Sequence, residues 1–150
     1  MTAELAARGA EVTAVDISPA LVEIARARLP QAHAARVRFA SGDMLADDHG
    51  AFDYVLAMDS MIYYAVPDIA RALDRLGDRT EQAVIFTVAP RTPFLMTFWS
   101  LGKLFPRADR SPTMIPHAFD RLSRATGHRL SRVARVSRGF YISECLEFRP

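Results

Sequence analysis

Three aspartates each follow an apolar segment that has the pattern of a strand. Asp16 follows EVTAV, Asp43 follows VRFASG, and Asp59 follows FDYVLAM. In open α/β sheets, ligands bind beyond the carboxyl ends of the strands. A carboxylate there can accept hydrogen bonds from both hydroxyls of a ribose, or one from the exocyclic amine of adenine. Each acid alone also fits an N-cap or a turn. Three acids at successive strand ends, with Gly42 directly before Asp43, favour a nucleoside-bearing ligand.

Strands and helices alternate along the 150 residues. A short helix ends at Gly9, and Ser18 and Pro19 offer an N-cap and a first helical position for the next helix. This alternation predicts one α/β domain with a parallel sheet covered on both faces. Two alternating segments around Gly139 predict a terminal antiparallel hairpin at its edge. The expected strands are 11–15, 37–40, 52–58, 83–88, 129–136 and 140–148, and the expected helices are 3–8, 20–29, 68–76, 93–105 and 116–126.

Charge is distributed unequally between the two parts of the chain. Residues 1–90 carry 8 Arg against 13 Asp and Glu, a net charge of −5, whereas residues 91–150 carry 10 Arg and Lys103 against 4 acids, a net charge of +7. A basic C-terminal third can attract an anionic substrate, a membrane surface or nucleic acid, and a solvated face is the plain alternative. Because aromatic residues do not alternate with these arginines, the pattern does not favour nucleic acid.

Composition excludes several classes of protein. Half of the residues are apolar and 24% are charged, as in a globular protein. The single cysteine, Cys145, allows no internal disulfide and indicates a reducing cytoplasm. The longest apolar stretch, residues 93–101, is about half as long as a membrane span. The four histidines lie at no metal-ligand spacing, which predicts no protein-bound metal: His33, His49, His117 and His128.

Longer segments resemble the class I S-adenosylmethionine (SAM)-dependent methyltransferases. EVTAVDIS, RFASGDML and FDYVLAMDSMIYY are similar to their second, third and fourth strand motifs, and the terminal hairpin suits the antiparallel strand that ends their sheet. AMDSMIYY, FTVAPRTPFL, GKLFPRADRSP and SRGFYISECLEF resemble the magnesium protoporphyrin IX methyltransferases of bacteriochlorophyll synthesis. This resemblance covers nearly the whole chain and implies a Rossmann-like class I methyltransferase sheet.

The resemblance also implies how the site is divided. Residues 1–90 would bind SAM as cosubstrate, and residues 91–150 would receive the porphyrin. In the cosubstrate part, one group of residues would hold the ribose, a second the adenine, and a third would line the floor under the methionine portion and the methyl group. These are, in that order, Asp16 with Ile17 and Ser18; Gly42, Asp43 and Met44; and Met58, Asp59 and Ser60.

The substrate would be a propionate carboxylate of magnesium protoporphyrin IX. A carboxylate is already ionised at neutral pH, so the reaction needs positioning of the nucleophile rather than a strong base. Tyr63 stands where the family is expected to have His, and its hydroxyl can position the carboxylate. Tyr64 would lie on the substrate side, and Arg91, Arg107 and Arg110 could bind the second propionate through paired hydrogen bonds.

Other readings stay open at this stage. An acid after the second strand also occurs in NAD-binding Rossmann proteins, and a class I methyltransferase with another small-molecule acceptor shares the same motifs. A truncated, non-catalytic porphyrin-binding module is a third reading. The family association implies magnesium chelatase as a partner. The apolar segment 93–105 could shelter the macrocycle or contact a membrane surface, which would add loose peripheral membrane association to a cytoplasmic location.

One departure from the family concerns the start of the sequence. The acidic, Gly-rich loop after the family's first strand has no counterpart here, because residues 3–8 match the helix that follows that loop. The first strand lies at the centre of the family's sheet, between the second and the fourth. Its absence would leave two half-sheets with unpaired backbone edges. The chain is therefore expected to be an N-terminally truncated form that, as residues 1–150 alone, folds poorly and binds SAM weakly or not at all.

Overall fold

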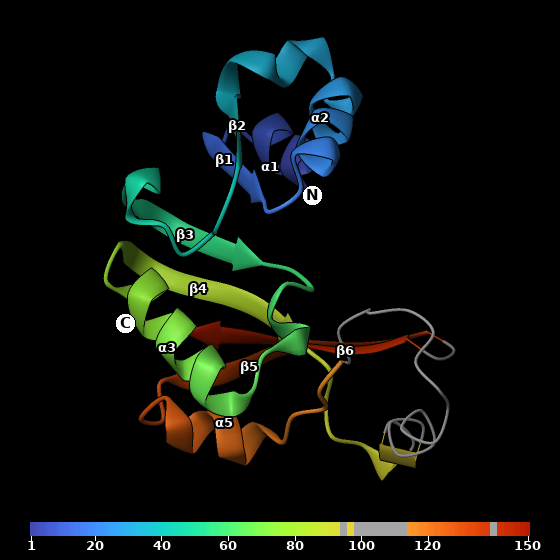
Figure 1. The fold of residues 1–150 in the computed structure, drawn as a ribbon, viewed down its shortest axis with the longest axis vertical. Coiled ribbons are helices and arrows are strands. Elements are labelled where there is room, and N and C mark those ends of the chain that lie inside the picture. Colours follow the sequence, from blue (N-terminus) through green and yellow to red (C-terminus); the bar gives the residue numbers. More distant parts are fainter. Residues whose placement is uncertain (94–95, 98–113, 139–140) are drawn as a thin grey trace. The chain divides into compact units, whose positions relative to one another are not determined.

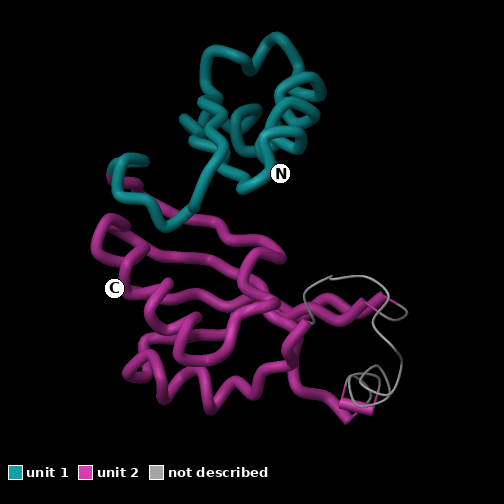
Figure 2. The backbone as a smooth tube through the Cα atoms, in the orientation of Figure 1, with its two compact units in different colours: residues 1–50 teal, residues 51–150 magenta. Residues whose placement is uncertain are grey.

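The structure consists of two compact units, residues 1–50 and residues 51–150 (Figures 1 and 2). It is a computed structural model that describes residues 1–93, 96–97, 114–138 and 141–150. The six described strands form a two-stranded sheet in the first unit and a four-stranded sheet in the second. These two sheets match the two half-sheets that the sequence predicts.

The first unit is built around a strand–helix–strand crossover. Its two strands are parallel, with Val12 opposite Val37 and Asp16 opposite Ser41. Few apolar residues of this 50-residue unit are buried. They are Ala6, which is 2% exposed, and Val22, which is 5% exposed. In chain order the elements are α1 (Thr2–Ala7), β1 (Val12–Asp16), α2 (Pro19–Arg28), the 3-10 helix η1 (Gln31–Arg36), β2 (Val37–Ser41) and the 3-10 helix η2 (Asp47–His49).

Helix α2 begins where its sequence signals place it. The Ser18 side chain accepts a hydrogen bond from the backbone N–H of Leu21 at 3.4 Å, and Pro19 occupies the first turn. The cap satisfies one of the N–H groups that a helix start leaves without a partner, and the ring of proline fixes a helical φ. The result is a short connection from β1 into α2 that starts directly after Asp16.

The second unit contains a mixed sheet with strand order β3–β4–β6–β5. Strands β3 and β4 are parallel, whereas β6 runs antiparallel to both β4 and β5. The predicted terminal hairpin is therefore confirmed. The elements are β3 (Phe52–Ala57), the 3-10 helix η3 (Met61–Tyr63), α3 (Val66–Gly77), β4 (Thr80–Val88), α5 (Phe119–Ala125), β5 (Leu130–Arg138) and β6 (Tyr141–Phe148).

The core of the second unit lies where α3 packs against β4 and α5. The apolar residues of α3 at helical spacing, Ile69, Leu73 and Leu76, are all 2% exposed or less. They are buried together with side chains of β4, α5 and β6, namely Val84, Phe86, Val88, Leu122, Leu146 and Phe148. No helix within the described part of the chain is long and apolar enough to cross a membrane.

Three predicted element starts differ from the structure by two or more residues. Helix α3 begins two residues earlier than expected, at Val66, with Pro67 in its first turn. Strand β4 begins at Thr80 because Thr80 pairs with Phe52, and the Thr80 hydroxyl donates to the carbonyl of Leu76 at 2.6 Å.

Helix α5 begins at Phe119 rather than at Pro116. The preceding backbone is extended by long-range hydrogen bonds, since the N–H of Ile115 donates to the carbonyl of Ile62 at 2.8 Å. The N–H of His117 donates to the carbonyl of Ala89, also at 2.8 Å. Most of the helix expected over 93–105 lies outside the described residues.

Candidate functional site

In the first unit, Asp16 closes β1 and faces the loop that follows β2. Its carboxylate oxygen Oδ1 accepts a hydrogen bond from the N–H of Ser18 at 2.8 Å, and its carbonyl accepts one from the N–H of Gly42 at 3.0 Å. No described residue donates to its other oxygen, Oδ2. Ile17, directly beyond, is 83% exposed. A carboxylate with one oxygen fixed and the other open can accept a hydrogen bond from a ligand at this strand end.

Asp43 shapes the turn after β2. Gly42 has φ +145°, in the region that glycine adopts most readily, and nothing lies within 4 Å of a Cβ built there. The carboxylate of Asp43 accepts from the N–H of Leu45 at 2.9 Å, and the carbonyl of Asp43 lies 2.9 Å from Nε2 of His49. Met44 is half-buried in this turn. The structure thus brings Asp16 and Asp43 to the same end of the small sheet, as the sequence predicts for two adjacent parallel strands.

In the second unit, Asp59 occupies an unusual backbone position directly beyond β3. It has φ 53°, a left-handed conformation that costs a non-glycine residue about 1 kcal/mol or more. Its N–H donates to the hydroxyl of Thr87 at 2.8 Å, and that hydroxyl donates to Oδ1 of Asp59 at 3.0 Å. The hydroxyl of Tyr141 lies 3.3 Å from both carboxylate oxygens. Three strands of one sheet therefore contribute to holding one carboxylate.

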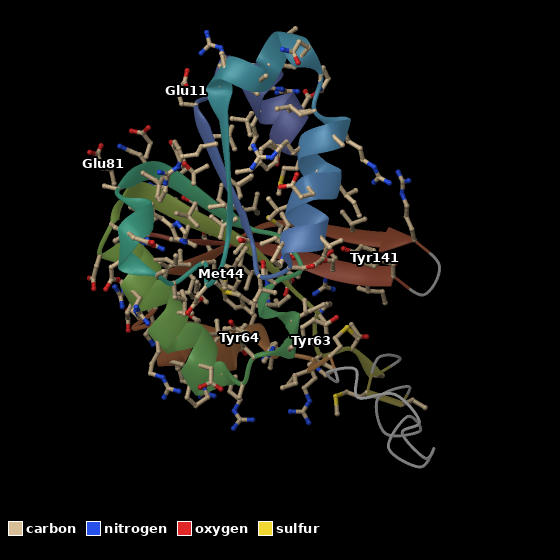
Figure 3. All side chains as sticks on the ribbon, turned by 45° about the horizontal axis from the view of Figure 1, so that its top comes forward. Glu11, Met44, Tyr63, Tyr64, Glu81 and Tyr141 are labelled. Carbon is tan, nitrogen blue, oxygen red and sulfur yellow. The ribbon has the colours of Figure 1, made fainter. Side chains whose placement is uncertain are left out.

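The residues around Asp59 are partly open to solvent. Met58 is 43% exposed, and the Ser60 hydroxyl donates to the carbonyl of Met58 at 3.2 Å. Figure 3 shows Tyr63 and Tyr64 on the turn that follows β3, and Tyr141 on the terminal hairpin. Tyr63 is 44% exposed and Tyr64 is half-buried. Tyr63 is thus partly open to solvent, and its positioning role stays a prediction.

Arg91 follows β4, where the backbone pairs with the segment that carries His117. The N–H of Arg91 donates to the carbonyl of His117 at 2.7 Å, and Pro90 forms an isolated bridge with His117. The Arg91 side chain is exposed. Arg107 and Arg110, the other two arginines predicted to bind substrate, lie outside the described residues.

His117, one of the four histidines at no metal-ligand spacing, is a buried titratable group beside Pro90. Its side chain is hydrogen-bonded to the backbone of Tyr64, and its Nε2 has no hydrogen-bond partner among the described residues. Burial lowers the pKa of His117 below its ordinary 6.5; the charge of Arg121 adds to this, and the hydrogen bond to Tyr64 opposes it. At neutral pH the imidazole is therefore neutral.

Thr87 and Tyr141 were also missed as site residues. Thr87 is a polar residue in a buried strand pattern, and it is 3% exposed. Such a residue signals a required hydrogen bond, although the partner is not visible in the sequence. Tyr141 lies 82 residues from Asp59, so only the register of the sheet brings the two together.

The fold is that of a class I methyltransferase. Residues 1–82 match the family model described as "Methyltransferase domain", and residues 57–150 match the one described as "Magnesium-protoporphyrin IX methyltransferase C-terminus". The chain belongs to the magnesium-protoporphyrin IX methyltransferase family.

Two curated relatives and one solved structure illustrate the relationship. The chain is 62% identical over 149 residues to the magnesium-protoporphyrin O-methyltransferase of Rhodobacter capsulatus, covering 99% of this chain and 66% of the relative. It is 28% identical to the chloroplastic magnesium protoporphyrin IX methyltransferase of Arabidopsis thaliana, covering 97% of this chain and 48% of the relative. The crystal structure of the Synechocystis PCC 6803 magnesium protoporphyrin IX methyltransferase with bound SAH is 26% identical, with a TM-score of 0.80 over 99% of this chain and 68% of that one. The chain thus spans about half to two thirds of the curated relatives it matches.

The buried imidazole predicts a specific pH dependence of stability. Below pH 6.5 the unfolded chain binds a proton that folded His117 resists, so the free energy of unfolding should fall as the pH decreases from 7 to 5. The slope from this one group is at most about 1.4 kcal/mol per pH unit. Urea unfolding of the full-length protein should show a shallower decline for His117→Gln. Identical pH profiles for the variant and the wild type would contradict this assignment.

Proposed function

We propose that the full-length protein transfers the methyl group of SAM to a propionate carboxylate of magnesium protoporphyrin IX, giving the monomethyl ester in bacteriochlorophyll biosynthesis. The observation that carries this proposal is the 62% identity to the Rhodobacter capsulatus magnesium-protoporphyrin O-methyltransferase, which extends over 149 residues. It is supported by the match of residues 57–150 to the C-terminal family model, since these residues include the predicted substrate part.

The cosubstrate is proposed to lie along the carboxyl ends of the strands. Asp16 would accept from the ribose hydroxyls through Oδ2, with Ile17 and Ser18 beside the sugar. The exposed Ile17 side chain offers apolar contact to such a ligand. The bound SAH of the Synechocystis structure supports SAM as the methyl donor, because SAH is the product that SAM leaves behind.

The adenine is proposed to lie at the turn after β2. Gly42 allows close approach of the backbone, Asp43 offers a carboxylate to the exocyclic amine, and Met44 offers apolar contact to the ring. Met58, Asp59 and Ser60 would form the floor under the methionine portion.

The proposed reaction is an in-line displacement that needs no external base. A lone pair of the propionate oxygen forms a bond to the methyl carbon as the carbon–sulfur bond breaks, and the electrons of that bond stay on sulfur. The products are a methyl ester and the neutral thioether SAH, and no proton moves. Because a propionate is ionised at neutral pH, the protein must chiefly place its oxygen about 3 Å from the methyl carbon and exclude water.

Residues 91–150, together with the turn after β3, are proposed to receive the porphyrin. Tyr63 would hold the reacting carboxylate through its hydroxyl, and Tyr64 would contact the substrate. One arginine would bind the propionate that is not methylated, since a guanidinium binds a carboxylate through two parallel hydrogen bonds. The candidates are Arg91, Arg107 and Arg110. The reacting carboxylate must stay less tightly paired, because a strong ion pair would reduce its nucleophilicity.

Two further relations belong to the proposal. The chelatase that supplies the magnesium porphyrin would be a partner, because the product of one enzyme is then the substrate of the next. Loose contact with a membrane surface would suit a substrate with a large apolar macrocycle, and the net charge of +7 over residues 91–150 would favour an anionic surface.

The reaction is tested with SAM that carries a trideuterated methyl group. The full-length protein should convert magnesium protoporphyrin IX into its labelled monomethyl ester, detected by mass spectrometry. The dimethyl ester of the same porphyrin, which has no free propionate, is the control and should take up no label. Transfer to a different acceptor, or no transfer to the free propionate, would contradict the proposal.

Removal of the Tyr63 hydroxyl should slow turnover without abolishing it. We expect Tyr63→Phe to lower kcat roughly 3- to 10-fold, the effect of one lost hydrogen bond. Tyr63→His, which restores a hydrogen-bonding group, should retain more activity than Tyr63→Phe. Complete loss of activity in Tyr63→Phe would show that the hydroxyl does more than position the carboxylate.

Removal of the Arg91 guanidinium should weaken porphyrin binding selectively. Arg91→Ala is expected to raise the Kd for magnesium protoporphyrin IX about 10-fold or more, while the Kd for SAM stays unchanged. Arg124→Ala, which removes an exposed arginine on α5, is the matched control. Unchanged porphyrin affinity in Arg91→Ala, measured by fluorescence quenching, would remove Arg91 from the substrate site.

A further inference from the structure

Among the described residues, the side chains that hydrogen-bond to the carboxylate of Asp59 are neutral hydroxyl groups. The Thr87 hydroxyl uses its single proton on Oδ1, and it uses a lone pair to accept from the N–H of Asp59. The Tyr141 hydroxyl approaches both oxygens at 3.3 Å. No ion pair of the described residues includes Asp59. The negative charge is thus oriented, and no described residue supplies a counter-charge to it.

The backbone conformation of Asp59 supports the same interpretation. A left-handed φ is uncommon at a residue with a Cβ, and such positions concentrate at functional sites. Thr87 holds this one through the Asp59 backbone N–H as well as through the carboxylate. An ionised carboxylate has about four acceptor positions, so two hydroxyl donors leave room for a ligand that carries several N–H groups.

We propose that Thr87 and Tyr141 are positioning residues that hold the Asp59 carboxylate for the α-ammonium group of the methionine portion of SAM. This inference rests on the proposed function, since it assumes that SAM is the cosubstrate. The ammonium has three N–H donors and a full positive charge, which suits an oriented carboxylate without a counter-charge.

The other cationic group of SAM is a poor partner for this carboxylate. The sulfonium has no N–H to donate, and its charge disappears as the methyl group leaves. A carboxylate beside the sulfonium would stabilise the ground state more than the transition state and would slow the reaction. The ammonium keeps its charge throughout, so pairing with it adds binding energy without that penalty.

Tyr141 also connects two parts of the chain. It begins β6 in the terminal hairpin, within the residues proposed to receive the porphyrin, whereas Asp59 follows β3 among those proposed to bind SAM. The contact between them gives the hairpin a role in orienting the cosubstrate in addition to closing the sheet.

The test compares two ligands that differ in the amino-acid portion. SAH carries the ammonium, whereas 5′-methylthioadenosine has the same nucleoside and sulfur without it. In the full-length protein, Tyr141→Phe should weaken SAH binding roughly 3- to 10-fold by isothermal titration calorimetry and leave 5′-methylthioadenosine binding unchanged. Tyr54→Phe, at another exposed tyrosine of the same unit, is the matched control and should change neither affinity.

Two further variants separate positioning from folding. Asp59→Asn should weaken SAH binding more than Tyr141→Phe does, and in the Asp59→Asn background Tyr141→Phe should have no further effect. Thr87→Val should act like Tyr141→Phe, and Thr87→Ser should restore binding because it restores the hydroxyl. If Thr87→Val fails to fold, the double-mutant cycle of Asp59→Asn and Tyr141→Phe still tests the inference without it.

The outcomes distinguish this inference from the proposed function. If Tyr141→Phe binds SAH as the wild type does, or weakens both ligands equally, the inference is wrong even where the wild type methylates the porphyrin. If the predicted pattern of SAH binding appears but the porphyrin is not methylated, the inference stands and the proposed substrate is wrong. If the wild type binds no SAH, both are wrong.

Discussion

The pairing of β4 on both of its edges is the constraint on which the larger unit depends. Strand β4 pairs in parallel with β3 and antiparallel with β6, and its side chains Val84, Phe86 and Val88 are fully buried. The same strand supplies Thr87 to the Asp59 carboxylate. Its continuation pairs with the segment that carries His117. The burial that stabilises this sheet is therefore also what positions the candidate site.

Neutral hydrogen-bond donors orient the charged groups of the candidate site. Aspartates at strand ends are held by backbone N–H groups and hydroxyls, which orient a carboxylate without neutralising it. His117 stays neutral at neutral pH because burial disfavours its charged form, and the charge of Arg121 acts in the same direction. In the proposed function, a cationic cosubstrate and an anionic acceptor would meet groups of opposite charge on different segments of the chain.

Local signals explain what the sequence predicted well. Ser18 and Pro19 place the start of α2 as expected. The acids also lie at strand ends as expected: Asp16, Asp43 and Asp59. The helix start and the strand ends both depend mainly on residues that are neighbours in the sequence. The predicted start of α5 at Pro116 was wrong, because a hydrogen bond between residues 115 and 62 keeps the backbone before Phe119 extended.

Long-range register explains what the sequence did not reveal. Tyr141 reaches Asp59 only because β6 lies beside β4, and no local pattern records that neighbour. The buried state of His117 likewise follows from the junction with the end of β4. The resemblance to a family predicts the chemistry, whereas the contacts of Thr87 and Tyr141 with Asp59 follow only from the three-dimensional fold.

A crystal structure of the full-length protein with bound SAH would test the central claim most directly. The account predicts the SAH ammonium nitrogen about 3 Å from an Asp59 carboxylate oxygen, with the Tyr141 hydroxyl on the same carboxylate. An ammonium bound by other groups, with Asp59 turned away from the ligand, would contradict it.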